Sequence, residues 1–326
     1  MNPPSVVAGA TSTWPVVKRV LTVVFFGFVT WLLFRHARTI AWAHVWASMR
    51  EMPHGVVALG AALAVASHLL YSTFDLFGRH LTGHPLKTGR VMVVTFISYA
   101  FNLNLSAFVG GIAFRYRLYA RLGLSNEVIT RVLTTSMLTN WLGYTALAGA
   151  VFLFRPLALP PDWKLGSEGL QALGGLLLAV AAAYVLACAA SKKRSWTLRG
   201  HELTLPSWRV AGMQLAASCT NWLLIAGIVH VLLQQRFSYS TILSVMLIAA
   251  VAGVIAHVPA GIGVLEATFV TLLSHRMPKG ELLGALLAYR TLYYLIPLIV
   301  ASVTYVFVEA RAKALAHDPL RPTEPP

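Results

Sequence analysis

Charged side chains are scarce in this sequence. Asp, Glu, Lys and Arg make up 11% of its 326 residues, against about a quarter in a typical soluble domain. Hydrophobic residues make up 57%, so the chain cannot cover its own surface with polar groups. This composition excludes a soluble globular protein and a disordered one. Acidic residues are scarcer than basic ones, 11 against 26, which gives a net charge of +15. In a membrane protein, Lys and Arg are enriched in the cytoplasmic loops. We therefore take the excess to indicate which loops face the cytoplasm, and we expect no nucleic-acid partner.

Cysteine and the motifs of soluble enzymes are also missing. Cys188 and Cys219 lie in separate apolar segments with no CxxC spacing, which excludes a disulfide framework and leaves no ligand cluster for a metal. There is no GxSxG, HExxH or P-loop motif. The longest polar stretch, Ser191–Arg209, is too short for a catalytic domain. We therefore expect a protein that is not an enzyme and uses no cofactor or metal.

Long apolar runs dominate what is present. A helix needs about 20 apolar residues to cross a bilayer, and backbone groups in lipid must be bonded within the chain. The sequence thus predicts an all-α integral membrane protein, one polytopic domain over residues 1–326, whose first apolar run is a retained span. The candidate segments are Val20–Phe34, Met52–Phe74, Val91–Phe114, Val132–Phe154, Gly169–Ser191, Val210–Gln235, Phe237–Leu265 and Leu282–Val308.

Two of these runs, Val91–Phe114 and Phe237–Leu265, contain residues that break helices. Each run is either an ordinary span or a re-entrant hairpin that enters and leaves by the same face. The breaking residues are Gly110, Gly111, Pro259, Gly261 and Gly263.

The distribution of basic residues decides between these alternatives. With both runs re-entrant, 17 of the 26 Lys and Arg lie on the cytoplasmic side and eight on the opposite face. With both runs crossing fully, the split becomes 11 inside and 14 outside, against the positive-inside rule. We therefore predict about six full transmembrane helices, two broken re-entrant hairpins and cytoplasmic N- and C-termini.

The two broken runs also resemble one another. At an offset of 150 residues, Gly111 and Ile112 match Gly261 and Ile262. Each hairpin is followed by one span, which gives repeat units at about 91–154 and 241–308 that enter from opposite faces. Inverted repeats with broken helices are the architecture of alternating-access transporters. The alternative is two unrelated kinked helices.

Three further segments have recognisable patterns. Trp and apolar residues at helical spacing beside Arg38 and Arg50 predict an interfacial helix at about 38–50. The alternation in Trp196–Leu205 predicts a small hairpin. The Pro-rich tail at about 317–326 is typical of disorder.

Two charges lie inside the predicted membrane region, where each costs at least ~2.5–3.5 kcal/mol and needs a partner or a purpose. Glu266 follows the second break and either caps the half-helix that starts there, or holds Arg290 or gates a headgroup. Arg290 favours a bidentate anion, for which Glu266 and a lipid phosphate are the candidates. Snorkelling to the membrane surface is its alternative.

Two arginines after the first break have two interpretations. Arg115 and Arg117 follow a glycine pair, which suits a phosphate headgroup, although ordinary positive-inside charge gives the same pattern. Asp75 is expected to pair with Arg79, four residues on.

Intramembrane amides and one histidine complete the candidates. Asn140 and Asn221 recur in two Thr-Asn-Trp-Leu segments, and they either bond between helices or line a cavity. His257, beside the second break, is either a titrating group in that cavity or a satisfied core histidine.

Several of these segments together resemble a known family. The Pro259-x-Gly-x-Gly-x-x-Glu266 element, the Gly110-Gly111 segment and the Ala-Tyr-Arg290 run with Pro297 are similar to the signatures of the lysylphosphatidylglycerol synthase transmembrane, or flippase-like, family. The resemblance covers nearly the whole chain, and it carries over Glu266 and Arg290 as site residues.

The resemblance implies lipid handling without lipid synthesis, since the family's aminoacyltransferase is a separate domain. We expect an inner-membrane lipid flippase or transporter of bacterial type, acting on an anionic phospholipid or lipid-linked headgroup. Membrane phospholipids are its expected partners, with a lipid-synthesis enzyme as a candidate protein partner. The rival is a non-transporting scaffold or accessory subunit in phospholipid or envelope biogenesis.

Overall fold

A computed structural model describes residues 50–105, 107–157, 159, 166–191, 195–198, 201–256 and 263–316, together with Val24 and Trp31. The chain divides into two units, Met1–Ala43 and His44–Pro326, and the elements from α3 to α13 belong to the second. The predicted first span, the interfacial helix at about 38–50 and the tail at 317–326 lie outside the described residues, apart from Val24, Trp31 and Arg50.

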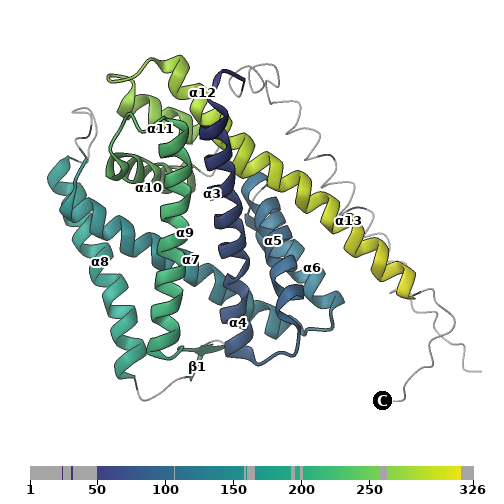
Figure 1. Cartoon of the computed structure of the whole chain (residues 1–326). Helices are drawn as coiled ribbons and strands as arrows, with labels where there is room; N and C mark the ends of the chain where they lie inside the picture. Colours follow the sequence, from purple (N-terminus) through teal and green to yellow (C-terminus); the bar gives the residue numbers. More distant parts are fainter. Residues whose placement is uncertain are drawn as a thin grey trace, which may run out of the picture. The chain divides into compact units, whose positions relative to one another are not determined.

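Helices make up nearly all of the described part (Figure 1). Two short segments, η1 and η3, are π-helical. In chain order the elements are α3 His54–Ser72, α4 Phe74–Thr82, α5 Thr88–Asn104, η1 Ala107–Ala113, α6 Phe114–Arg121, α7 Asn126–Phe154, α8 Ser167–Ala190, β1 Ser195–Leu198, β2 His201–Thr204, α9 Trp208–Leu232, α10 Tyr239–Ala256, α11 Val264–Leu273, α12 Lys279–Arg290, η3 Thr291–Leu295 and α13 Ile296–Ala316.

Five helical stretches in the described part are long and apolar enough to cross a membrane. They overlap five of the six predicted full spans, and the sixth, Val20–Phe34, lies outside the described residues apart from Val24 and Trp31. The all-α membrane fold is therefore confirmed. The stretches are His54–Thr82, Asn126–Phe154, Ser167–Ala190, Trp208–Leu232 and Lys279–Ala310.

The first broken run folds back on itself. Helix α5 packs against both η1 and α6, so the chain reverses direction after Asn104. A Cβ on Gly110 would lie 2.0 Å from the backbone nitrogen of Asn102. Only glycine allows the two backbones to approach this closely, which explains why a glycine stands in the π-helical turn.

The second broken run is also a hairpin, because α10 packs against α11. Helix α11 begins after Gly263, whose φ of 81° lies in the left-handed region that glycine adopts without strain. Pro259, Gly261 and His257 lie outside the described residues. How both hairpins sit in the membrane stays a prediction.

The last span is interrupted by the π-helical segment η3, directly after Arg290. Pro297 in α13 has no N–H to donate, and its ring clashes with the carbonyl four residues earlier in a regular α-helix. A π-helical turn before the proline relieves this conflict. It also sets the direction of Tyr293 and Tyr294, which lie in that turn.

The element boundaries repeat along the chain. Helix α10 begins 151 residues after α5, α11 begins 150 after α6, and α12 begins 153 after α7. The repeat units at about 91–154 and 241–308 stay a prediction. The opposite orientation of the two units in a bilayer stays a prediction.

Helices α3 and α9 lie side by side in Figure 1 and contact one another extensively. Their facing residues join α10, α11, α12 and η3 in one buried hydrophobic cluster. Between α8 and α9, β1 pairs with β2 in an antiparallel hairpin, which confirms the short hairpin predicted at Trp196–Leu205.

Candidate functional site

A cavity of about 330 Å³ opens where both hairpins and the spans α3, α7, α9 and α12 come together. Seven aromatic rings and two amides line it, and none of its described lining residues is charged. The lining residues are Tyr71, Tyr99, Asn102, Leu103, Asn140, Trp141, Trp222, Ile225, Met246, Ala249, Ala250, Gly253, Val264, Leu265, Tyr289, Tyr293 and Tyr294. We call it the central cavity.

The repeated Thr-Asn-Trp-Leu segments contribute both tryptophans of the central cavity. Trp141 and Trp222 each meet the ring of Tyr144 edge-on, at centroid distances of 5.5 and 5.3 Å. The backbone carbonyl of Asn140 accepts from the indole N–H of Trp222 at 3.4 Å and from Ser218 at 3.0 Å. The repeat in sequence therefore marks the place where α7 and α9 cross beside the cavity.

A chain of buried hydroxyl groups runs along one wall. Ser67 donates to the Oδ1 of Asn221 at 2.7 Å, and its oxygen lies 3.0 Å from the hydroxyl of Tyr293. Since the single hydrogen of Ser67 is used, Tyr293 donates to Ser67 and Tyr99 donates in turn to Tyr293 at 2.8 Å. This network links α3, α5, α9 and η3.

The two predicted amides have different positions. Asn140 is among the residues that line the central cavity. Asn221 is fully buried outside that lining and takes part in the interhelical hydrogen bond to Ser67. Of the two readings left open by the sequence, the structure thus displays cavity lining for Asn140 and interhelical bonding for Asn221.

Glu266 and Arg290 form a bidentate ion pair. The Nε of Arg290 donates to Oε1 of Glu266, and a terminal guanidinium nitrogen donates to Oε2 at 3.0 Å. The same Oε2 accepts from the backbone N–H of Gly263 at 3.0 Å, which caps α11. Two of the roles considered for Glu266, cap and partner of Arg290, are therefore present together, and the gating of a headgroup stays a prediction.

This ion pair borders the central cavity. Leu265, next to Glu266 in the chain, lines the cavity, and so does Tyr294. The guanidinium carbon of Arg290 lies 5.4 Å from the ring centroid of Tyr294, within the range of a cation–π interaction. The side chains of Arg290 and Glu266 keep 14% and 23% of their exposure.

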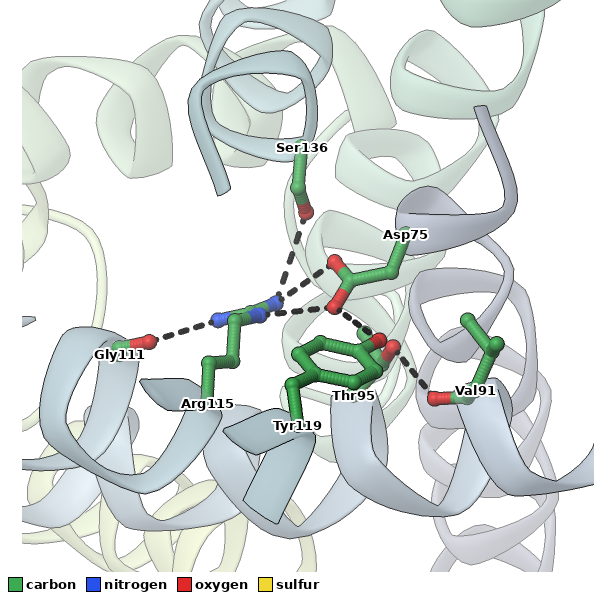
Figure 2. A network of polar contacts seen from close by, with 7 residues as sticks. All are labelled: Asp75, Val91, Thr95, Gly111, Arg115, Tyr119 and Ser136. Carbon is green, nitrogen blue, oxygen red and sulfur yellow. Dashed lines mark hydrogen bonds and ion pairs between the residues drawn. The ribbon is translucent and has the colours of Figure 1, made fainter. Parts of the chain in front are cut away.

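A second ion pair is fully enclosed (Figure 2). The Nε of Arg115 donates to Asp75 at 2.9 Å and one terminal nitrogen donates at 3.2 Å. Tyr119 donates to the same carboxylate at 2.9 Å. The guanidinium nitrogens also reach the carbonyl of Gly111 at 3.1 Å and Ser136 at 3.5 Å. The cluster joins α4, α6, α7 and η1, and its charges cancel.

The prediction that Asp75 pairs with Arg79 was wrong. Asp75 is a partner of Arg115 and Tyr119 instead, while Arg79 donates to Thr88 at 2.7 Å. The buried face of α4 turns Asp75 toward α6, and a partner 40 residues away replaces the one four residues away.

The predicted phosphate-binding arginines are engaged in this structure. Arg115 is enclosed with Asp75, and Arg117 donates to the hydroxyl of Tyr305 at 2.9 Å. Arg117 also lies 3.6 Å from Glu309, which is in addition the ion-pair partner of Arg121. These contacts connect α6 with α13. A role of Arg115 and Arg117 in headgroup binding stays a prediction.

The sequence did not single out Ser67, Tyr99 or Tyr293. Tyr289 and Tyr293 recur one turn apart and their rings stack at 5.5 Å. Two tyrosines one helical turn apart inside an apolar span are the sequence feature from which this wall of the cavity could have been predicted.

Known proteins share these features of sequence. The sequence pattern of the family described as "Lysylphosphatidylglycerol synthase TM region" matches residues 19–301. The inner membrane protein YbhN of Escherichia coli is 45% identical over 303 residues, covering 93% of this chain and 95% of that protein. An uncharacterized protein of Synechocystis is 30% identical, covering 81% and 82%.

Shorter similarity extends to a named enzyme. The phosphatidylglycerol lysyltransferase of Staphylococcus haemolyticus is 30% identical over 94 residues, which is 28% of this chain and 11% of that enzyme.

Proposed function

Since the chain belongs to the family of the lysylphosphatidylglycerol synthase TM region, we propose that it is a lipid flippase or lipid transporter. Its substrate would be an anionic phospholipid or a lipid-linked anionic headgroup. The observation that carries the proposal is the central cavity with the Glu266–Arg290 pair at its border.

The lining of the central cavity suits a polar headgroup in transit. Amides and phenol hydroxyls donate and accept hydrogen bonds without a full charge, so they can hold a headgroup without trapping it. Aromatic rings supply contact area at a low cost in side-chain entropy. Asn102 and Asn140 are the amides available for this purpose.

Arg290 is the group that would recognise the phosphate. Its planar guanidinium matches a phosphate as well as a carboxylate, in two parallel hydrogen bonds. A phosphate reaching the cavity border would take the place of Glu266, whose carboxylate stays bonded to Gly263 at the start of α11. Arg290 thus exchanges one anion for another and is not left unpaired in the membrane.

The predicted inverted repeat supplies a mechanism for movement. In alternating access, one repeat unit rocks against the other around a site at mid-depth. The central cavity draws its lining from both units, α5 and α7 from one and α10, α11 and α12 from the other. At the ends of these units the backbone would hinge at four glycines: Gly110, Gly111, Gly261 and Gly263. Arg115 and Arg117, next to the first pair of glycines, would bind the headgroup.

We place the protein in the inner membrane of a bacterium with both termini in the cytoplasm, as a transporter and not an enzyme. The orientation has a direct test. Reporter fusions after Arg121 and after Lys193 should both report cytoplasm, and a fusion near Pro161 should report periplasm. A periplasmic signal after Lys193 would remove the re-entrant hairpins and the inverted repeat together.

Reconstitution tests the function. Purified protein in liposomes containing labelled phosphatidylglycerol should speed the loss of label from the outer leaflet. Arg290→Gln should abolish that gain. Arg236→Gln is the matched control, because it breaks an ion pair to Glu281 that is half exposed and lies outside the central cavity. A rate equal to that of protein-free vesicles would contradict transport and favour the scaffold alternative.

A further inference from the structure

A hollow of about 420 Å³ lies where α4 ends and α5 begins, away from the central cavity. The end of α4 supplies an arginine and a histidine, and the short connection to α5 supplies a second histidine. The lining residues are Leu76, Arg79, His80, Gly83, His84 and Thr88. We call it the α4–α5 hollow.

Its electrostatic character is positive. Arg79 points across the hollow and donates to the hydroxyl of Thr88, the first residue of α5, at 2.7 Å. The N-terminus of α5 has no side-chain cap and no acidic residue in its first turn, so its backbone N–H groups and dipole add positive potential. Asp75, the nearby carboxylate, is already bonded to Arg115 and Tyr119.

His84 provides an independent observation. Its side chain lines the hollow and yet only 6% of the residue is exposed. Neither ring nitrogen has a hydrogen-bond partner among the described residues. Buried polar groups in native proteins are nearly always bonded, and one explanation of an exception is a water or an ion bound at that place.

We propose that the α4–α5 hollow binds a phosphate group, belonging either to a lipid headgroup or to free phosphate. Arg79 supplies the charge, the start of α5 supplies backbone N–H donors, and the ring of His84 rotates one nitrogen toward a phosphate oxygen. The same arrangement of a helix N-terminus with a cation serves anions generally. The inference concerns binding alone and holds whether or not the protein transports lipid.

The proposal includes a dependence on pH. Burial, and next the charge of Arg79, lower the pKa of His84, while Asp75 opposes them. The groups that face His84 are thus Arg79, Asp75 and the ring of Tyr119 at 6.3 Å. A bound phosphate favours the protonated ring and raises its pKa, so binding takes up a proton. Affinity should rise as pH falls through the titration of His84.

Equilibrium dialysis of the full-length protein in detergent against radiolabelled inorganic phosphate tests the site. We expect saturable binding of one phosphate, weakened at least about tenfold in Arg79→Gln. Arg90→Gln is the matched control, because Arg90 is exposed at the same end of α5 and does not line the hollow. It should change the affinity less than about twofold. Equal weakening by both variants would show diffuse positive charge and overturn the site.

A second experiment distinguishes a lipid headgroup from free phosphate as the ligand. In nanodiscs, a photo-crosslinkable phosphatidic acid should label the residues of the hollow in wild type and not in Arg79→Gln. Binding of inorganic phosphate without labelling by phosphatidic acid would assign the site to free phosphate, and labelling alone would assign it to a headgroup. Absence of both would overturn the proposal. His84→Gln should in addition flatten the pH dependence, and an unchanged pH profile in that variant would remove His84 from the site.

Discussion

The Asp75–Arg115 and Glu266–Arg290 pairs are alike in chemistry and differ in setting. Asp75 and Arg115 retain 0% and 4% of their side-chain exposure and share their hydrogen bonds with Tyr119, Ser136 and a backbone carbonyl. Glu266 and Arg290 remain partly exposed beside a cavity. The enclosed pair keeps almost no exposed surface, whereas the bordering pair keeps some beside the central cavity.

We propose that this difference gives the two pairs different tasks. A pair whose three guanidinium nitrogens are all bonded holds the first hairpin against α4 and α7. A pair that keeps access to a cavity can exchange its carboxylate for another anion. Burying either pair costs desolvation, and the loss of one partner leaves an uncompensated charge. The comparison predicts that stability depends most on the first pair and transport on the second.

The largest effect is expected at the enclosed pair. Arg115→Gln should lower the free energy of unfolding by about 3–5 kcal/mol, because Asp75 is then buried without its counter-charge. Thermal unfolding in detergent measures this. The double variant Asp75→Asn with Arg115→Gln should recover part of the loss. A melting temperature of Arg115→Gln close to that of wild type would contradict the assignment.

Breaking the Glu266–Arg290 pair should lower the free energy of unfolding by less. Glu266→Gln and Arg290→Gln should each lose about 2–3 kcal/mol, below the range for full burial, since both side chains keep part of their exposure. A double-mutant cycle on thermal stability measures their coupling. The double variant should be more stable than either single variant yet inactive in transport, and Arg290→Lys should not restore transport. Additive losses would mean that the two residues act independently.

The turn of the first hairpin should tolerate no side chain. Gly110→Ala places a methyl group 2.0 Å from a backbone nitrogen of α5, and overpacking of this kind costs about 1–3 kcal/mol. Gly175→Ala in α8 is the matched control, because a Cβ there meets no atom within 4 Å. Equal melting temperatures for the two variants would show that α5 and η1 do not pack as closely as the structure has them.

The start of α11 should show the smallest effect. Gly263→Ala should cost about 1 kcal/mol, since a left-handed φ strains any residue with a Cβ, while the open space around it avoids a clash. Gly263→Asn should cost less, because asparagine enters the left-handed region more readily. If alanine proves as stable as glycine in the same unfolding assay, the turn before Glu266 differs from the one described.

The sequence predicted features that depend on local pattern. The five long spans follow from apolar length, and the short β1–β2 hairpin follows from alternation. The contact between Glu266 and Arg290 was also among the predictions, because two charges in apolar surroundings with few local partners favour each other.

Features that depend on distant partners could not be predicted. Asp75 contacts a residue 40 positions away, and Ser67 contacts one 226 positions away. Such pairs are set by the rotation of one helix against another, and periodicity does not encode that rotation. Because periodicity indicates only local partners, Asp75 was predicted to pair with Arg79, one helical turn further on. That prediction was wrong.

A structure of the full-length protein in nanodiscs of anionic phospholipid would test the central claim most directly. The account predicts headgroup density in the central cavity, with a phosphate at hydrogen-bonding distance from Arg290 and Glu266 still bonded to the backbone of Gly263. A cavity without headgroup density, with the Glu266–Arg290 pair intact and lipid confined to the outer surface of the helices, would contradict it.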